Sequence, residues 1–587
     1  MKPYKRNTIF MFCWIARRMP CYTMQYFLYA MLTQLSMFIG NVLLLKTMTE
    51  IIISRENGMR AVYVMAVYIV YCVSSNLYRA YFKECGQKKA KERMSALLHK
   101  EIYDRAVKVD LADYDNTKFY QAFLLATDDA ENQIDRFLNA ITEFISCACN
   151  VALTSLVFLS IDYGVLLFAV FAAAVTLLPH KRIMELKKGR KEKEKSHERK
   201  RQYFFHCFYL KDYLKEIQTG GMEGLLLEYD GENNRDYLHA VEKENRGLAG
   251  LNIIQNVLPE HVIMNFGLCG YLLYKVFIAG TVTAAGFIAA FNGINVLVSG
   301  LYRMLGFCMG QIKENEIFIR NFRGFLDYRS AILHGGKKRE DHEFTGIQIK
   351  GLHFAYPGKE AEVLSGIWMD ISARKKIAIV GRNGCGKTTF VMNLLRLYQA
   401  SAGKIYLNGI EAEEYDLQSY RGTFVSLFHD YKLFAVSIAE NISMDEEYDE
   451  EKVKYVLQKE GLGEIAGDVS RTVYREFDRN GIELSGGQMQ RLAIGRVMYS
   501  SAPVMVLDEP SSALDAIEEK RFNQAIAEAS ENRTVIFISH RLTTVRMADI
   551  IYVIEDGKIL EKGTHEELIG NHSLYERMWR IQTEAYQ

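Results

Sequence analysis

Residues 381–389 read Gly381-Arg-Asn-Gly-Cys-Gly-Lys-Thr-Thr389, and they decide the fold of the C-terminal part of this 587-residue chain. They match the pattern G-x-x-x-x-G-K-[ST], whose glycines let successive backbone N–H groups point at a polyphosphate. An apolar stretch, Lys376-Ile-Ala-Ile-Val380, precedes the loop, and a helix-like apolar segment follows it. Since anions bind at helix N-termini, this strand–loop–helix order predicts a nucleoside triphosphate site.

The residue types in the loop indicate what each position does. Lys387 would reach the β- and γ-phosphates, and the Thr388 hydroxyl would hold Mg²⁺. The other loop residues expected at the nucleotide are Gly381, Asn383, Gly384, Cys385, Gly386 and Thr389.

A second block follows about a hundred residues later. Leu484-Ser-Gly-Gly-Gln488 precedes an amphipathic helix, and the apolar strand 504–507 then ends in Asp508-Glu509-Pro510. Asp508, at a strand end, is placed to hold the Mg²⁺ shell, and Glu509 is placed to polarise the attacking water. Another apolar strand, 534–539, ends at His540.

These ordered motifs resemble the nucleotide-binding domain of ABC transporters over about residues 345–587. The resemblance implies that Glu509 and His540 are catalytic, and that Tyr356 stacks on adenine. From the residues alone, Tyr356 fits adenine stacking and ordinary edge-strand packing equally well. The resemblance also implies a signature motif that binds ATP held by a second subunit, made of Ser485, Gly486, Gly487 and Gln488.

One motif departs from the ABC pattern. The family's Q-loop aligns with residues 425–434, and His429 occupies the position of its glutamine. In the family that glutamine senses Mg²⁺ and the attacking water and links them to the membrane helices. An imidazole can accept from water or touch a metal, but its reach is shorter and its charge depends on pH. The substitution is either tolerated or changes the rate of the ATPase site.

The average composition hides a division of the chain into two halves. Mean hydropathy is −0.07 and the net charge is +1, values typical of a soluble protein, yet the first 310 or so residues contain long apolar segments. The ten cysteines include no C-x₂-C pair. Neither a disulfide framework nor a zinc site is therefore indicated.

Six apolar segments are long enough to span a bilayer, which needs about 20 mostly apolar residues. Gln34, Asn150 and Asn292 interrupt them, which favours helices that face a polar cavity. Long soluble core helices are the alternative, which the apolar hairpin 141–178 disfavours. The expected spans lie near residues 23–48, 61–82, 139–160, 163–183, 249–278 and 283–308.

Charge in the loops predicts the orientation of the spans. Residues 181–201 contain eleven Lys and Arg against four Glu, and positive charge beside spans is retained in the cytoplasm. Both long loops, the N-terminus and the ATPase are therefore expected to face inward. A nucleic-acid-binding role for this run is disfavoured because spans flank it.

The layout resembles the exporter type of ABC half-transporter, which implies a six-helix membrane bundle joined to an α/β P-loop NTPase domain. In that family short helices at the inner-loop tips dock onto the ATPase, here near residues 111–120 and 213–221. The expected parts are an amphipathic inner-leaflet helix (1–22), a transmembrane domain (23–328), a linker (329–344) and the nucleotide-binding domain (345–587).

The resemblance implies ATP-driven export by a homo- or heterodimer that uses ATP and Mg²⁺ in the plasma (inner) membrane, with no nucleic-acid partner. The substrate is expected to be a peptide, a drug-like amphipath or a lipid. Two alternatives remain: a membrane-bound sensor or regulator, and a soluble ABC ATPase of the translation or DNA-repair type, which the six spans disfavour.

Overall fold

The computed structural model of the chain forms two compact units. Residues 1–105 and 122–327 make the N-terminal unit, and residues 106–121 and 328–587 make the C-terminal unit. The structure describes every residue outside a set of short gaps: 1–2, 55–57, 117–118, 121–122, 124–126, 128–129, 331, 333–335, 337–342, 476–477, 511–515, 540, 571 and 585–587.

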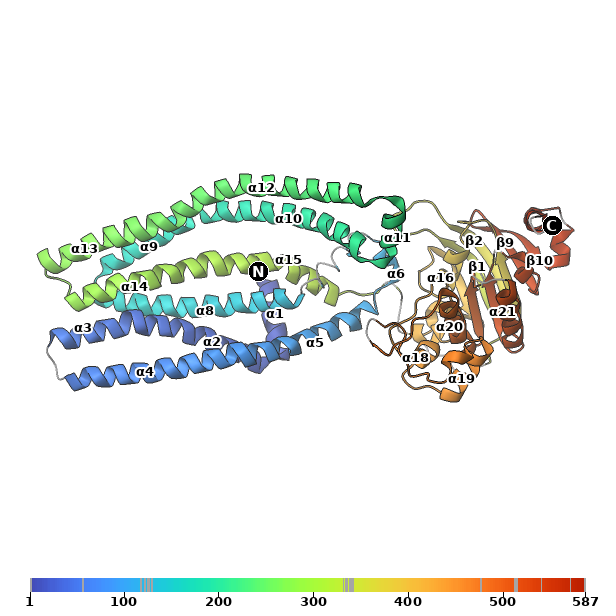
Figure 1. The fold of residues 1–587 in the computed structure, drawn as a ribbon, viewed down its shortest axis with the longest axis horizontal. Helices are drawn as coiled ribbons and strands as arrows, with labels where there is room; N and C mark the ends of the chain where they lie inside the picture. The colour runs from blue at the N-terminus through green and yellow to red at the C-terminus, as the bar shows by residue number, and fades with distance from the viewer. Residues whose placement is uncertain are drawn as a thin grey trace. The chain divides into compact units, whose positions relative to one another are not determined.

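The N-terminal unit is a bundle of long helices (Figure 1). Within the described residues, six helices are long and apolar enough to cross a membrane, as the sequence predicted. The helices of this unit are α1 (Pro3–Arg18), α2 (Pro20–Phe38), η1 (Ile39–Leu44), α3 (Leu45–Ile53), α4 (Gly58–Tyr81), η2 (Phe82–Gly86), α5 (Gln87–Ala106), α8 (Ala130–Ile161), α9 (Tyr163–Leu177), α10 (His180–Tyr209), α11 (Lys211–Gly220), α12 (Glu223–Val257), η3 (Leu258–Leu268), α13 (Cys269–Leu273), η4 (Tyr274–Ile278), α14 (Ala284–Tyr302), η5 (Arg303–Cys308) and α15 (Met309–Leu326).

The helices continue well beyond the apolar spans. Gly58–Ala106 forms one helix of 49 residues, and Ala284–Leu326 one of 43 residues, so charged ends extend past the apolar part. For the fifth span, the apolar stretch found within the described residues is His261–Ile278, which lies inside the expected range 249–278. The polar helix α12 passes directly into η3, a π-helical segment that contains Pro259. Since the helix is not interrupted at the membrane boundary, helix continuity does not mark where this span begins.

The N-terminal helix α1 packs against the bundle. Met11, Trp14 and Ile15 are buried, and the Trp14 ring meets Phe322 of α15 edge-on at 5.6 Å. The Arg323 guanidinium lies 5.0 Å from the Phe10 ring, and its Nη1 donates to Asn7 (3.2 Å). One apolar face of α1 is thus covered by the helix that ends the bundle.

Two polar residues of the spans do not line a cavity, contrary to the sequence-based expectation. Gln34 and Asn150 are buried, and Asn150 Nδ2 donates to the Gln34 carbonyl (2.9 Å) and to Gln34 Oε1 (3.1 Å). Thr154 donates to Asn150 Oδ1 (3.1 Å). Polar groups in a membrane bundle can satisfy each other between helices. The sequence shows that such groups are present, but not that α2 and α8 bring them together.

Close approach of the membrane helices depends on small residues. A Cβ atom at Gly293 of α14 would lie 2.9 Å from Phe158 of α8 and 2.9 Å from Val42 of η1. Small residues at helix contacts permit such packing in membranes. Any larger residue at this position would push the three segments apart.

The C-terminal unit contains two sheets. A six-stranded sheet has the order β10-β9-β3-β8-β7-β6, and a four-stranded antiparallel sheet has the order β2-β1-β4-β5. The elements are α6 (Leu111–Tyr114), β1 (Gly346–Phe354), β2 (Leu364–Ser372), β3 (Lys376–Val380), α16 (Lys387–Leu394), β4 (Ala402–Leu407), β5 (Ile410–Glu411), η6 (Ala412–Glu414), α17 (Leu417–Arg421), β6 (Phe424–Leu427), α18 (Ile438–Ser443), α19 (Glu450–Lys459), η7 (Gly463–Ile465), α20 (Gly486–Tyr499), β7 (Val504–Asp508), α21 (Ala516–Ala529), β8 (Thr534–Ile538), α22 (Leu542–Val545), β9 (Ile550–Glu555), β10 (Lys558–Gly563), α23 (His565–Ile569) and α24 (Leu574–Glu584).

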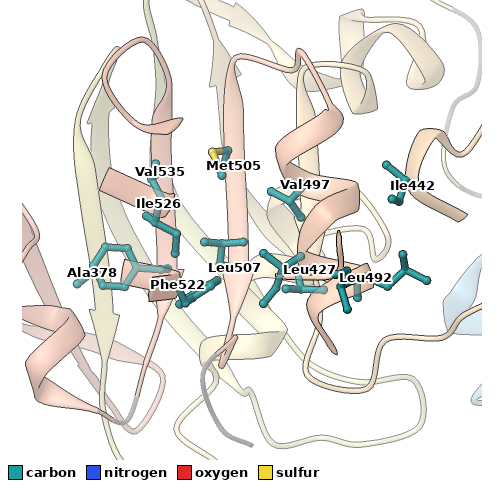
Figure 2. Close-up of a cluster of buried hydrophobic side chains, with 14 of the residues drawn as sticks. Ala378, Leu427, Ile442, Leu492, Val497, Met505, Leu507, Phe522, Ile526 and Val535 are labelled. Atoms are coloured by element: carbon teal, nitrogen blue, oxygen red, sulfur yellow. The ribbon is translucent and has the colours of Figure 1, made fainter. Parts of the chain in front are cut away.

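The central strands of the six-stranded sheet are parallel and buried on both faces. Every residue of β7 and β8 is buried, as continuous apolar strands predict. Figure 2 shows Met505 and Leu507 of β7 in a cluster with Leu492 and Val497 of α20. The α20 helix, which follows the LSGGQ segment, is therefore fixed to the strand that ends in Asp508.

Candidate nucleotide site

The predicted site residues meet at one edge of the six-stranded sheet. Strands β3, β8, β7 and β6 run parallel, so their carboxyl ends lie at the same edge. The phosphate loop follows β3, Asp508 ends β7, and His429 lies two residues beyond β6. Ligands of open α/β sheets bind outside the carboxyl ends of the strands, so this edge is the candidate site.

Glycines shape the phosphate loop. Gly384 and Gly386 have φ angles of 80° and 104°, which other residues rarely adopt. A Cβ at Gly386 would lie 2.9 Å from the Val363 carbonyl oxygen, whereas one at Gly384 would meet nothing within 4 Å. Backbone therefore crowds one side of the loop, and space for a ligand is left beside Gly384.

Lys387 lies inside this loop. Its side chain is buried, and Nζ donates to the carbonyls of Gly381 (3.0 Å) and Arg382 (2.9 Å). These contacts hold the ammonium group over the loop at the first residue of α16. A helix N-terminus, backbone amides and a fixed cation together suit a polyphosphate.

Asp508 and Thr388 are suited to hold a divalent cation. The Asp508 side chain is 1% exposed, and neither carboxylate oxygen has a hydrogen bond of acceptable geometry within the described residues. Burial raises the pKa of Asp508, while the nearby Thr388 hydroxyl lowers it. A buried carboxylate is costly unless its charge is compensated, and Mg²⁺ takes oxygen ligands at one or two carboxylates plus phosphates and waters. These residues therefore fit Mg²⁺.

Glu509 has a strained backbone conformation. Its φ is 51°, in the left-handed region that a residue with a side chain avoids, and its N–H donates to the Ile538 carbonyl (3.0 Å). Such strain is concentrated at functional sites. The bond to β8 fixes the turn in which the chain leaves the buried strand immediately after Asp508.

The Q-loop histidine lies beside the candidate metal site. His429 Nδ1 is 4.0 Å from Asp508 Oδ2, and the imidazole is 55% exposed. The residue that aligns with the Q-loop glutamine thus lies beside Asp508 in the structure. This position fits both a tolerated and a functional substitution.

Exchanging this histidine for glutamine tests the two interpretations. We expect His429→Gln to lower the Mg²⁺ concentration that half-saturates ATP hydrolysis several-fold, because an amide oxygen is a harder ligand than an imidazole nitrogen. Titrating MgCl₂ at fixed ATP measures the effect. The exposed His572→Gln serves as the matched control. A titration curve identical to that of the parent protein would make His429 a passive replacement.

Tyr356 contacts the helix that follows the phosphate loop. Its hydroxyl lies 2.9 Å from Thr389 Oγ1, and its ring meets Phe354 edge-on at 5.1 Å. It also meets Tyr398 edge-on at 5.5 Å. No sequence motif singled out Tyr398, because an aromatic residue after a helix is an ordinary core residue.

The signature segment begins α20 with a capping box. Ser485 Oγ accepts from Gln488 N–H (3.2 Å), and Ser485 N–H donates to Gln488 Oε1 (2.9 Å). A Cβ at Gly486 or Gly487 would meet none of the described residues within 4 Å. The glycines are thus open to an approaching ligand, while the Gln488 side chain is used in the cap.

Four of the remaining predictions concern Asn383, Thr389, His540 and the segment 512–515. Asn383 is exposed on the phosphate loop, and Thr389 is buried against Tyr356. His540 and the segment 512–515 lie outside the described residues.

Cys385 is less accessible than its place in the loop suggests. It is 8% exposed, and its Sγ lies 4.0 Å from Lys387 Nζ. Burial raises the pKa of the thiol, and Lys387 offsets this only in part. Only the thiolate reacts with alkylating reagents. A raised pKa leaves less thiolate at a given pH than an exposed cysteine has.

Alkylation should therefore inhibit ATP hydrolysis slowly at neutral pH and faster as the pH rises, with the rate still climbing at pH values where an exposed cysteine is already ionised. Prior ATP should protect. N-ethylmaleimide inactivation rates measured against pH, with and without ATP, test both points. Equal sensitivity of Cys385→Ala would assign the inhibition to another cysteine.

Comparison with known proteins finds relatives of the C-terminal part of the chain. Residues 364–512 match the family model described as ABC transporter. The ATP-dependent lipid A-core flippase of Salmonella paratyphi A is 35% identical over 249 residues, which cover 42% of this chain and 43% of the flippase. The flippase of Haemophilus ducreyi is 33% identical over 302 residues, covering 51% and 52% of the two chains. The chain thus matches about half or less of the length of these relatives.

A solved structure extends the comparison to the whole fold. A bacterial Atm1-family ABC exporter with ATP bound superposes with a TM-score of 0.77, covering 97% of this chain and 98% of the other at 20% identity. At this identity the likeness concerns the fold alone. The chain is thus a multi-pass membrane protein with an ATPase domain of the ABC transporter family, and its fold is that of an ABC exporter.

Proposed function

We propose that this chain is a half-transporter that couples ATP hydrolysis to export of an amphipathic lipid. The observation that carries the proposal is the buried Asp508 carboxylate, which lies at the end of β7 beside Thr388, His429 and the phosphate loop. A domain that only needed to fold would have no reason to keep such a group buried. The six apolar helices supply the membrane part.

Different site residues are proposed to bind the phosphates, hold the metal ion and activate the water. Lys387 and the loop amides would bind the phosphates, and Thr388 and Asp508 would hold Mg²⁺, which neutralises charge on the transferred phosphoryl group. Glu509 would orient the attacking water and accept its proton. His540 and Tyr356 are proposed to contact the γ-phosphate side and the adenine. The other proposed nucleotide contacts are Gly381, Asn383, Gly384, Cys385, Gly386 and Thr389.

We also propose that the protein works as a dimer in the inner membrane with its ATPase in the cytoplasm. Among the described residues, nothing lies within 4 Å of a Cβ at Gly486 or Gly487, so these glycines leave room for ATP held by a second subunit. ATP would then join the two ATPase domains, and hydrolysis would release them. The basic run 181–201 supports the cytoplasmic assignment.

A lipid is favoured among the substrate classes because the relatives are named lipid A-core flippases. The test uses the purified chain in vesicles of phosphatidylethanolamine and phosphatidylglycerol that contain a fluorescent lipid. Dithionite, which destroys the fluorophore only in the outer leaflet, measures ATP-dependent movement of the probe. Glu509→Gln in the same vesicles is the control.

The outcomes separate the candidate functions. Movement that requires ATP and Glu509 supports a lipid exporter, whereas movement of a peptide or drug probe instead would change the substrate class. ATP turnover without movement of any probe would favour a membrane-bound regulator. Absence of turnover would remove the ATPase proposal itself.

A further inference from the structure

A short segment of the first long loop belongs to the C-terminal unit. Residues 106–121, here called the inner-loop segment, contain the helical turn α6 and group with residues 328–587. Ala112 packs against the same apolar cluster as Tyr356. The segment therefore packs against the same apolar core as the proposed adenine platform.

One anchor of this segment is independent of the nucleotide site. Asp110 is buried, and its carboxylate accepts hydrogen bonds from the Ser330 hydroxyl, the Ile332 N–H (3.3 Å) and the Tyr328 hydroxyl (3.2 Å). Tyr328 also donates to Asp113. None of these partners belongs to the candidate nucleotide site, so this anchor does not depend on nucleotide contacts.

A second anchor leads to the nucleotide site. The Tyr398 hydroxyl donates to Asp115 Oδ2 at 2.6 Å, and the Tyr398 ring is buried. Burial and the neighbouring carboxylate both raise the pKa of Tyr398, so its hydroxyl stays protonated and donates. Hydrogen bonds to charged groups are the stronger ones in proteins. Movement of the Tyr398 ring would therefore be passed on to the residue that follows α6.

The Tyr398 ring is in turn held by the proposed adenine platform. Phe354, Tyr356 and Tyr398 form a triad of edge-on rings with centroids 5.1 to 5.5 Å apart. The Tyr356 hydroxyl is fixed by Thr389 at the start of α16. A base that stacks on Tyr356 would thus restrict a ring that packs directly against Tyr398.

The substitution in the Q-loop bears on the contacts that run from Tyr356 through Tyr398 to Asp115. The glutamine through which ABC transporters link the γ-phosphate side to the membrane helices is replaced by the half-exposed His429. Tyr398 contacts both the proposed adenine platform and the inner-loop segment, so it offers a connection that does not use the Q-loop glutamine.

We propose that Tyr398 is a positioning residue that transmits occupancy of the adenine platform to the inner-loop segment through its hydrogen bond to Asp115. The inference rests on the proposed function, because it takes Tyr356 as the platform for ATP.

Hydrogen exchange of the full-length protein tests the inference. The probes are ATP and inorganic tripolyphosphate, both without Mg²⁺ so that neither is hydrolysed. ATP should slow amide exchange in residues 106–121 about fivefold or more, the low end of couplings between sites. Tripolyphosphate, which has no base, should protect the phosphate loop but not residues 106–121.

Tyr398→Phe keeps the ring and removes only the hydroxyl. It should bind ATP within about twofold of the parent affinity and still show protection in residues 381–389, but lose the protection in residues 106–121. Asp115→Ala, which removes the acceptor, should have the same effect, and the double variant should add nothing further. Tyr415→Phe, which removes a buried hydroxyl bonded to the Leu407 carbonyl (3.1 Å), is the matched control and should behave as the parent.

Two results would overturn the inference. One is ATP-dependent protection of residues 106–121 that persists in Tyr398→Phe, and the other is equal protection by tripolyphosphate. Absence of protection at residues 381–389 in the parent would instead contradict the proposed nucleotide site, so the two failures can be told apart.

Discussion

Replacing Glu509 with Gln should leave ATP binding intact and reduce hydrolysis by about 10² to 10⁴-fold, the usual contribution of a general base. The amide keeps the size of the carboxylate but cannot accept a proton from water. The strained turn at φ 51° and the bond to Ile538 involve backbone only, so the substitution should not disturb them.

Phosphate release and nucleotide binding, measured on the same purified variant, separate the two effects. The exposed Glu531→Gln, just beyond α21, is the control for loss of one carboxylate from the same unit. Parental turnover in Glu509→Gln would remove Glu509 from the catalytic role. Weak ATP binding would show instead that the site had been damaged.

Replacing Lys387 with Ala should weaken ATP binding itself by about 10- to 150-fold. This range corresponds to about 1.5–3 kcal/mol for one hydrogen bond to a charged group. The ammonium group is buried and held by the carbonyls of Gly381 and Arg382, so its position is fixed before any phosphate arrives.

Equilibrium binding of a fluorescent ATP analogue measures the loss, with the exposed Lys375→Ala as the matched control for charge. Thermal unfolding without nucleotide should be followed in parallel, because the two carbonyls lose a partner in the variant. A stable variant that binds ATP at full strength would contradict the assignment of this lysine to the phosphates.

Motifs predicted the nucleotide site because its chemistry is local in sequence. The phosphate loop needs glycines at fixed offsets between a strand and a helix, and Asp508 and Glu509 need only to end a buried strand. Each requirement is met within a few residues. The structure brings these segments together because parallel strands deliver their carboxyl ends to one edge.

The sequence alone thus determined the long apolar helices, the buried strands and the place of a glycine-rich loop between a strand and a helix, because helix length, apolar runs and glycine spacing are properties of short segments. Only the tertiary structure decided that Gln34 pairs with Asn150, that Cys385 is buried and that Tyr398 joins Tyr356 to Asp115. The physical reason is that these contacts join residues 42 to 283 positions apart or depend on burial by distant segments. No local pattern records which distant side chain satisfies a buried polar group.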